Sequence, residues 1–409
     1  MSGQQTTEQD HGYPPDSPVA VPDLVYQPDG ADVVVGRHAT GAYVVLPADA
    51  AAVIQRLAEG MTPAQAGAWY EREHGEDIDV LSLLDDLVEF GVLPGPGAAP
   101  DASSARAAAP VRWRRLGELL FSRPALIGYG LLALAGLAVL IWQPDLRPTY
   151  DQIFFTDYLT VVTIVLAVGQ WPLILCHEAA HALAGRRLGL HTRMSISTRL
   201  NYLVVETAMD GLVTVPRRKR WLPMIAGIGC DLVMMAVLTL VAAALRAEDG
   251  SLPLAARLCL ALSYGTLLRV VWQLFFYLRT DIYYLLSLVL GTVDLHGTAA
   301  RMLGERLRRL TRRPAPERSP APPHPTDVRA ARWYMWLMVV GYAVTLTTFG
   351  MAIVPLAARF VVELVGRIAD PGGIWHVIDS YLVFLLAVGQ LALVAVVAIR
   401  NRAAARAQL

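Results

Sequence analysis

Two histidines and a glutamate form the group of residues in this chain that is best suited to chemistry. The run 177–181 reads His-Glu-Ala-Ala-His, which has the pattern His-Glu-x-x-His. Residues four apart lie about 40° apart around an α-helix, so both imidazoles can bind one metal ion. Glu178 lies beside them, where it can take a proton from water that zinc makes acidic. The spacing therefore predicts a hydrolytic zinc site with His177 and His181 as ligands and Glu178 as general base.

The position of this motif in the chain supports the same prediction. The motif directly follows 19 uncharged residues, 158–176, a length close to that of a membrane span. The alternative is a pair of helical histidines with a solvated glutamate at a membrane boundary. Because ionisable groups at such positions are usually functional, we favour the metal site. Cys176 adjoins His177 but points about 100° away around the helix, so we interpret it as a packing residue.

A catalytic zinc site needs a third protein ligand, and the sequence offers Asp281. This aspartate follows the apolar run 258–278 and precedes a further apolar run, which predicts that it lies on the same side of the membrane as His177. An ordinary loop charge explains such a position poorly. The alternative is an interfacial ion pair between Arg279 and Asp281. We favour Asp281 as a ligand.

Asp231 is a second carboxylate in an apolar setting. It lies inside the run 221–244, and Arg269 lies inside the run 258–278. A charge inside a membrane is costly, so both runs must face protein or water at these residues. Asp231 could complete the metal site in place of Asp281, pair with Arg269, or lie near a bound substrate. The sequence leaves these alternatives open.

Composition indicates the class of protein that carries these residues. Of the 409 residues, 55% are hydrophobic and 17% are charged, against roughly a quarter charged in soluble proteins. The 35 basic and 35 acidic residues cancel, which argues against a nucleic-acid partner. Apolar runs of roughly bilayer length predict a multi-span α-helical membrane protein with about six transmembrane helices, at residues 125–142, 158–176, 221–244, 258–278, 333–358 and 380–399.

Arginine-rich segments alternate with acidic loops between these runs. Arginines precede the first run, separate the second from the third, and separate the fourth from the fifth. The excess of arginine predicts that these segments, and with them both termini, lie on the cytosolic side. Residues 195–215, in the second of these segments, show partial alternation of apolar and polar residues and predict strand structure.

The first 124 residues have a different character. Residues 24–93 predict a small α+β domain, with two or three strands in 24–46 followed by three helices at 48–58, 63–73 and 80–90. Thr62, Pro63 and Gln65 form a capping signature for the second helix. Residues 1–23 predict a disordered tail, and residues 94–124 predict a linker that ends in a basic juxtamembrane segment. The membrane domain then comprises residues 125–409.

Residues 158–290 resemble the site-2 protease superfamily of intramembrane zinc metalloproteases, especially its bacterial peptide-maturation branch. That family combines His-Glu-x-x-His with a later Asp-Gly-Tyr-Tyr type segment, which residues 281–284 match as Asp-Ile-Tyr-Tyr. The resemblance implies zinc ligation by His177, His181 and Asp281, with Glu178 as base. Residues 226–231, Ala-Gly-Ile-Gly-Cys-Asp, are similar to a further family segment, which implies a role for Asp231 near the substrate. In this family the region after the second span forms a β element that can pair with an extended substrate, and the alternative is a short cytosolic hairpin.

Residues 24–93 resemble PqqD-like leader-recognition domains of pathways that modify ribosomally made peptides. The features are the order and spacing of Val-Gly-Arg at 35–37, the apolar strand at 41–46, Gly-Met-Thr-Pro at 60–63 and Leu-Leu-Asp-Asp-Leu at 83–87. The resemblance implies a winged-helix-like fold that binds a leader peptide as an added strand between its third strand, at Tyr43, Val44 and Val45, and its third helix. A winged helix for dimerisation or DNA binding is the alternative, but the few arginines among many carboxylates argue against DNA.

Together the two resemblances imply a multi-pass zinc endopeptidase of the bacterial cytoplasmic membrane. It would capture a precursor peptide and cut it near the cytosolic face during maturation of a ribosomally synthesised modified peptide. The implied partners are a leader peptide or a membrane-anchored protein substrate, membrane lipid and an export transporter. Two alternatives remain: a non-enzymatic membrane receptor for export or immunity with a degenerate metal site, and regulated intramembrane proteolysis of a signalling protein.

Overall fold

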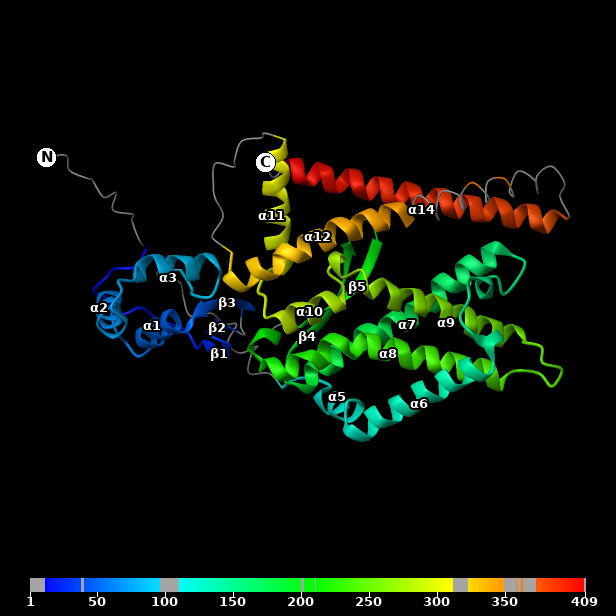
Figure 1. Ribbon diagram of the computed structural model, residues 1–409, viewed down its shortest axis with the longest axis horizontal. Helices are drawn as coiled ribbons and strands as arrows, with labels where there is room; N and C mark the ends of the chain where they lie inside the picture. Colours follow the sequence, from blue (N-terminus) through cyan, green and yellow to red (C-terminus); the bar gives the residue numbers. More distant parts are fainter. Residues whose placement is uncertain are drawn as a thin grey trace. The chain divides into compact units, whose positions relative to one another are not determined.

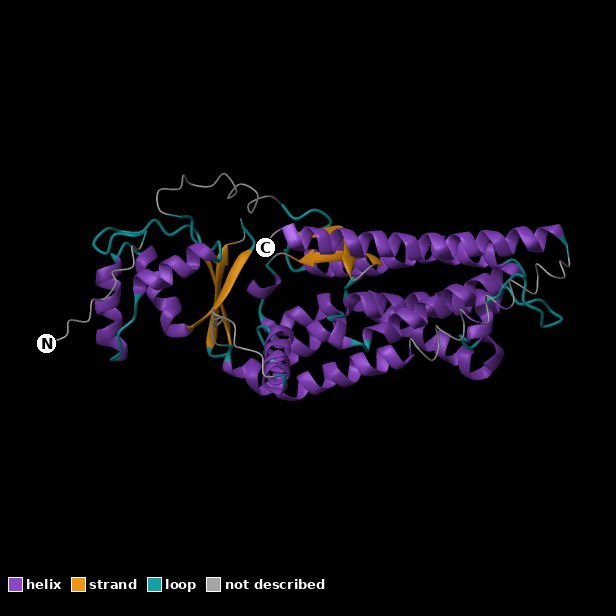
Figure 2. Cartoon of the chain, turned by 90° about the horizontal axis from the view of Figure 1, so that it is seen from above, coloured by secondary structure: helices purple, strands orange, loops and turns teal. Residues whose placement is uncertain are grey.

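The structure is a computed structural model that describes residues 12–37, 40–95, 110–199, 202–209, 211–311, 323–348, 358, 362 and 373–407. The chain forms two compact units (Figure 1). Unit 1 takes in Met1–Arg114, Leu188–Thr192 and Met209–Arg220. Unit 2 takes in Arg115–Arg187, Arg193–Ala208 and Trp221–Leu409. The strands form two separate sheets, and helices make up most of the rest (Figure 2).

Unit 1 contains a three-stranded antiparallel sheet in the order β1-β2-β3, followed by three helices. Its elements are β1 (Val25–Asp29), β2 (Asp32–Arg37), β3 (Ala42–Pro47), α1 (Ala48–Ala58), α2 (Pro63–His74) and α3 (Val80–Glu89). They confirm the predicted strands and helices. The capping box is also confirmed: Thr62 accepts a hydrogen bond from the Gln65 amide at 3.3 Å, and the Gln65 side chain accepts one from the Thr62 amide at 3.1 Å.

The core of unit 1 extends beyond the predicted domain at its N-terminal side. Val19 is buried in this core, and Tyr13 and Val21 pack against it. The Tyr13 hydroxyl donates a hydrogen bond to the Pro94 carbonyl at 2.7 Å. The structure therefore differs from the disordered tail predicted for residues 1–23, because residues 13–21 cover apolar surface that residues 24–93 alone leave exposed; residues 1–11 lie outside the described part of the chain.

A buried arginine, Arg220, contacts residues 213–215 within unit 1. Arg220 donates hydrogen bonds to the carbonyls of Val213 and Val215 and forms a 2.9 Å ion pair with Asp29 of β1. The short 3-10 helix η3 (Leu212–Thr214) overlaps this segment and contacts β1. In the described sheet β1 pairs with β2 and also contacts η3, whereas β3 pairs with β2.

The rest of the described chain consists mainly of helices. They are α5 (Arg114–Leu120), α6 (Arg123–Trp142), α7 (Leu159–Arg187), α8 (Arg217–Ala244), α9 (Leu254–Gln273), α10 (Asp281–Leu290), α11 (Leu295–Leu310), α12 (Pro325–Thr348) and α14 (Ile374–Ala407). Short 3-10 helices η1 (Pro144–Leu146), η2 (Tyr150–Ile153) and η4 (Phe276–Leu278) lie in the connections. Within the described residues, α6, α7, α8 and α9 are long and apolar enough to cross a membrane.

These four helices correspond to the first four predicted spans. The fourth was predicted to extend to residue 278, but α9 ends at Gln273 and the chain then turns through η4. Arg279 follows in the left-handed region at φ 60°, where the chain turns into α10. The predicted spans at 333–358 and 380–399 fall on α12 and α14, but residues 349–357 lie outside the described chain. The six-span arrangement therefore stays a prediction.

Small residues and buried caps hold the helices of unit 2 together. A Cβ added at Gly136 of α6 would lie 2.7 Å from the Cβ of Ala236 in α8, so these helices approach closely only because residue 136 is glycine. Asp379 of α14 is buried and accepts hydrogen bonds from the Leu159 and Thr160 amides, both at 2.9 Å. This carboxylate satisfies backbone donors at the start of α7, the helix that carries the histidines.

The predicted strand structure in 195–215 is a hairpin. β4 (Thr192–Arg199) pairs with β5 (Tyr202–Met209) in a two-stranded sheet. β5 thus ends at Met209, six residues before the end of the predicted range, and the residues that follow contain the 3-10 helix η3 instead.

Candidate metal centre

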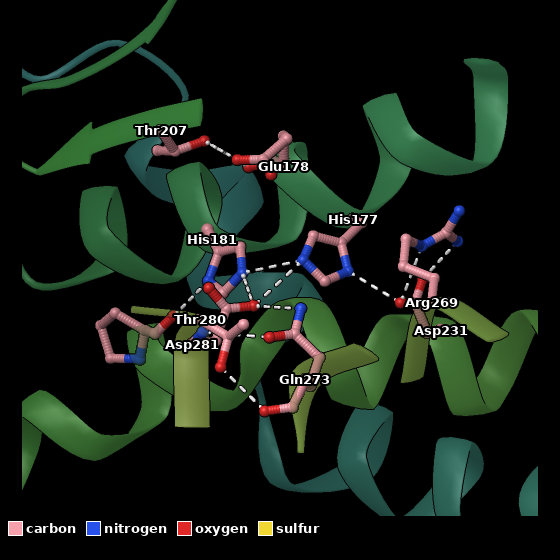
Figure 3. Close-up of polar contacts among 10 residues, drawn as sticks. His177, Glu178, His181, Thr207, Asp231, Arg269, Gln273, Thr280 and Asp281 are labelled. Carbon is pink, nitrogen blue, oxygen red and sulfur yellow. Dashed lines mark hydrogen bonds and ion pairs between the residues drawn. The ribbon is translucent and has the colours of Figure 1, made fainter. Parts of the chain in front are cut away.

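Four helices of unit 2 contribute polar side chains to one cluster (Figure 3). α7 contributes His177 and His181, which lie on the same side because they are four residues apart. α8 contributes Asp231, α9 contributes Arg269 and Gln273, and α10 begins with Asp281. The two histidines are 5% and 4% exposed, and Asp231 is completely buried.

His177, His181 and Asp281 form a triangle of ligand atoms. The Nε2 atoms of the two histidines lie 3.2 Å apart, and each lies 3.2 Å from Oδ2 of Asp281. Tetrahedral zinc with bonds of about 2.0–2.1 Å to nitrogen and oxygen needs ligand atoms about 3.3 Å apart. The triangle thus has the size of one face of such a site, and these three residues could hold one metal ion.

The other nitrogen of each imidazole has a partner that determines its protonation. His181 Nδ1 lies 2.6 Å from the Pro223 carbonyl, which can only accept, so this nitrogen carries the proton. His177 Nδ1 lies 2.9 Å from a carboxylate oxygen of Asp231. In the neutral histidines both Nε2 atoms are then unprotonated acceptors that face each other and the Asp281 carboxylate. A cation bound between these three acceptors would satisfy all of them, which is the arrangement of a metal site.

Asp231 belongs to the surroundings of the ligands rather than to the ligand triangle. Its carboxylate accepts hydrogen bonds from Arg269 Nε at 3.0 Å and Nη2 at 2.6 Å. Arg269 also donates to Gln170 on α7 at 3.1 Å. Of the alternatives that the sequence left open for Asp231, the structure thus contains the ion pair with Arg269. Because the same carboxylate accepts from His177, this network ties the imidazole orientation to three helices.

Gln273 holds Asp281 through both ends of its amide. Its nitrogen donates to Oδ2 of Asp281 at 2.9 Å, and its oxygen accepts from the Asp281 backbone amide at 3.0 Å. Thr280 donates to the Gln273 carbonyl at 2.8 Å. A carboxylate oxygen has two lone pairs, so one can accept from Gln273 while the other faces the histidines. The turn between α9 and α10 is thus fixed where the aspartate must point at α7.

Gly227 of α8 lies against both imidazoles. A Cβ at this position would lie 2.5 Å from Nε2 of His177 and closer still to Nε2 of His181. Real Cβ atoms are not found so close to other heavy atoms, so only glycine leaves the space at the converging nitrogens. Gly227 thus allows α8 to approach α7 closely at the two histidines.

Glu178 points away from the ligand triangle toward the β4–β5 hairpin (Figure 3). Its carboxylate is half-buried and accepts a hydrogen bond from the hydroxyl of Thr207 at 2.8 Å. Thr207 Oγ1 also lies 3.0 Å from the backbone carbonyl of Glu178. Glu178 thus neighbours the cluster without joining the three ligand atoms, and its role as a general base stays a prediction.

The structure brings together some of the predicted site residues and separates others. The ligand atoms of His177, His181 and Asp281 converge. Asp231 instead contacts Nδ1 of His177, on the opposite side of the imidazole from these atoms. Tyr43, Val44 and Val45 lie on β3 of unit 1, half-buried, in the strand that ends the sheet order.

Four contributions to the centre were not predicted. They are the side chains of Gln170, Gln273 and Thr207 and the carbonyl of Pro223. The two glutamines are polar residues in apolar runs, which is a signal that the sequence does contain. A carbonyl and a strand threonine carry no such signal.

Comparisons of the chain with protein-family models, with curated proteins and with solved structures found no match.

Proposed function

We propose that this protein is an intramembrane zinc endopeptidase of the site-2 protease type. The observation that carries the proposal is the convergence of two Nε2 atoms and one carboxylate oxygen at 3.2 Å, with a glutamate carboxylate on the next residue of the same helix. Metal-assisted hydrolysis of a peptide bond combines a Lewis acid with a general base, and this cluster supplies candidates for the residues that would hold the first and act as the second.

Each residue has a distinct part in this mechanism. Bound zinc would supply Lewis acidity, polarising the scissile carbonyl and making water easier to deprotonate. Glu178 accepts the proton of the attacking water and passes it to the leaving amine. Asp231 and Pro223 hold the Nδ1 sides of His177 and His181, so the unprotonated Nε2 atoms would bind the metal, and Gln273 orients Asp281. Burial of both histidines keeps bulk water away from the ligands.

The chain around the centre supports cleavage near a membrane surface. α7 is one continuous helix that contains both an apolar stretch and the metal-binding motif, so the motif follows the membrane span directly. The arginines that follow α7 favour the cytosolic side for this end. The proposed protein is thus a multi-pass protein of the bacterial cytoplasmic membrane, with both termini and the motif on the cytosolic side.

Unit 1 would capture the substrate as a PqqD-like, winged-helix-like domain. Its sheet ends at β3, and an extended peptide can add to an edge strand as a further strand. Tyr43, Val44 and Val45 on this strand are half-buried, so their side chains could contact an added strand. The proposed substrate is a precursor peptide whose leader binds at β3 before the membrane part cuts it.

Metal analysis tests the ligand assignment. We expect about one zinc per chain in the purified protein, since catalytic sites use three protein ligands and an open position. His177→Ala, His181→Ala and Asp281→Ala should each lower zinc affinity by more than about 100-fold. Asp231→Asn should lower zinc affinity by about 10- to 100-fold, the usual effect of losing a residue that hydrogen-bonds a metal ligand. Affinities are measured by competition with a chromogenic chelator in detergent.

Comparing the zinc affinities of the Asp281 and Asp231 variants decides which aspartate is the third ligand. Full zinc retention by Asp281→Ala together with complete loss in Asp231→Asn would transfer the third ligand to Asp231. A wild-type protein that binds no zinc would instead support the receptor alternative.

Hydrogen–deuterium exchange tests leader recognition on the full chain. The probe is the synthetic leader of a precursor peptide encoded beside this gene. At ten times its Kd, the leader should slow backbone amide exchange in β3 by about tenfold, because exchange requires release of the bound state. Exchange in β1 is the internal control and should not change. Protection of β1 without β3, or of neither strand, would contradict capture at β3.

A further inference from the structure

The β4–β5 hairpin carries one hydroxyl that contacts the candidate base. Thr207 Oγ1 donates to Oε2 of Glu178 at 2.8 Å, and Thr207 Oγ1 also lies 3.0 Å from the backbone carbonyl oxygen of Glu178. A hydroxyl has one proton, and a charged acceptor makes the stronger bond. The shorter contact, to the carboxylate, is therefore the principal one.

The contact depends on the register of β5. Side chains alternate along a strand, so Val205, Thr207 and Met209 lie on one face. Val205 is buried, which makes this the covered face of β5, and Thr207 is the polar residue between two apolar ones. A shift of one residue would replace the hydroxyl by the side chain of Glu206 or Ala208. The register of β5 therefore determines whether the Thr207 hydroxyl can reach Glu178.

We propose that Thr207 is the positioning residue for Glu178, through which the hairpin controls where the base points; this inference rests on the proposed function. A glutamate side chain rotates about three bonds, and an unanchored carboxylate spreads over many positions. Thr207 selects one of them, on the hairpin side of α7. Because the donor belongs to the hairpin, any peptide that shifts this hairpin also shifts the base.

A purely structural role for Thr207 makes a different forecast. If the hydroxyl only fastened β5 to the α7 backbone through the Glu178 carbonyl, its loss would lower stability and leave turnover per folded molecule unchanged. A positioning role lowers kcat in molecules that are folded and hold zinc, with little change in KM. Restoring a hydroxyl without the methyl group should then restore turnover.

The kinetic experiment compares Thr207→Val, Thr207→Ser and the control Thr163→Val. Thr163 lies on the same helix as Glu178, is exposed, and bonds only the Leu159 carbonyl one turn earlier among its described contacts. The substrate is the peptide that wild type cleaves fastest in a quenched-fluorescence library, and rates are normalised to zinc content. We expect Thr207→Val to lower kcat by about 10- to 100-fold, the effect of a hydrogen bond to a charged group. Thr207→Ser should stay within about threefold of wild type, and Thr163→Val should equal it.

A second readout needs neither substrate nor metal. In zinc-free protein, Thr207→Val and Glu178→Ala should both accelerate amide exchange in residues 202–209, because each removes one side of the same contact. Thr163→Val should not. Acceleration by only one of the two variants would show that the Thr207 hydroxyl does not hold the Glu178 carboxylate.

The two experiments separate this inference from the function on which it rests. If wild type cleaves peptides and Thr207→Val matches it in kcat, the positioning role is wrong while the protease proposal stands. If wild type cleaves no peptide, the protease proposal fails and the positioning role fails with it, whatever amide exchange shows about the contact.

Discussion

Glu178→Gln is expected to abolish detectable cleavage while zinc stays bound. Glutamine fills nearly the same volume and still accepts a hydrogen bond from Thr207, but it cannot take a proton from water. Loss of a general base typically lowers the rate by 10²- to 10⁴-fold, or about 3 to 5 kcal/mol of barrier. The measurement is cleavage of a tagged precursor in membranes, at matched expression and matched zinc content.

The matched control for this variant is Glu305→Gln. Glu305 is exposed on α11, so the same chemical change there should leave cleavage unaltered. Undiminished processing by Glu178→Gln would refute the protease mechanism, since a solvated glutamate would tolerate the change. Loss of zinc together with activity would instead make Glu178 a metal ligand.

Gly227→Ala is expected to remove metal binding and, with it, all activity. The added methyl group would lie against Nε2 of both His177 and His181, at the position where the ligand atoms converge. Relief requires moving α8 or rotating an imidazole away from Pro223 or Asp231. Overpacking typically costs about 1 to 3 kcal/mol of stability, so we expect a lower thermal midpoint together with zinc affinity reduced more than about 100-fold.

Gly229→Ala is the matched control on the same helix. A Cβ there meets nothing within 4 Å, and alanine is favoured over glycine in a helix by about 1 kcal/mol. This variant should bind zinc as wild type does and unfold at the same or a higher temperature. Equal zinc affinity in Gly227→Ala and Gly229→Ala would mean that the histidines do not converge beside α8.

The sequence alone determined the features that depend on local periodicity. Spacing of four residues on a continuous helix puts His177 and His181 on one face, whatever the rest of the chain does. The capping box at Thr62 and the helices of unit 1 likewise follow from neighbouring residues, and the structure contains them within one residue of the predicted bounds. Apolar length predicted the four long helices of unit 2 for the same reason.

Only the tertiary structure decided which aspartate faces the Nε2 atoms. Both Asp231 and Asp281 follow from the sequence as candidates, because each is a charge in an apolar setting. The packing of α8 against α7 places Asp231 next to Nδ1 of His177. The turn after α9 places Asp281 next to Nε2 of the same histidine. The choice depends on how separate helices rotate against each other, which no single helix encodes.

The partners that hold the site were also decided by tertiary structure. Thr207, Pro223 and Gln273 act through contacts with residues that are far away in the sequence or across a turn. A carbonyl at a helix proline and a hydroxyl on a strand look like ordinary local structure until a neighbouring element is packed against them. The packing of Tyr13 and Val19 on unit 1 has the same origin, because a segment without periodicity is ordered only by the apolar surface it covers.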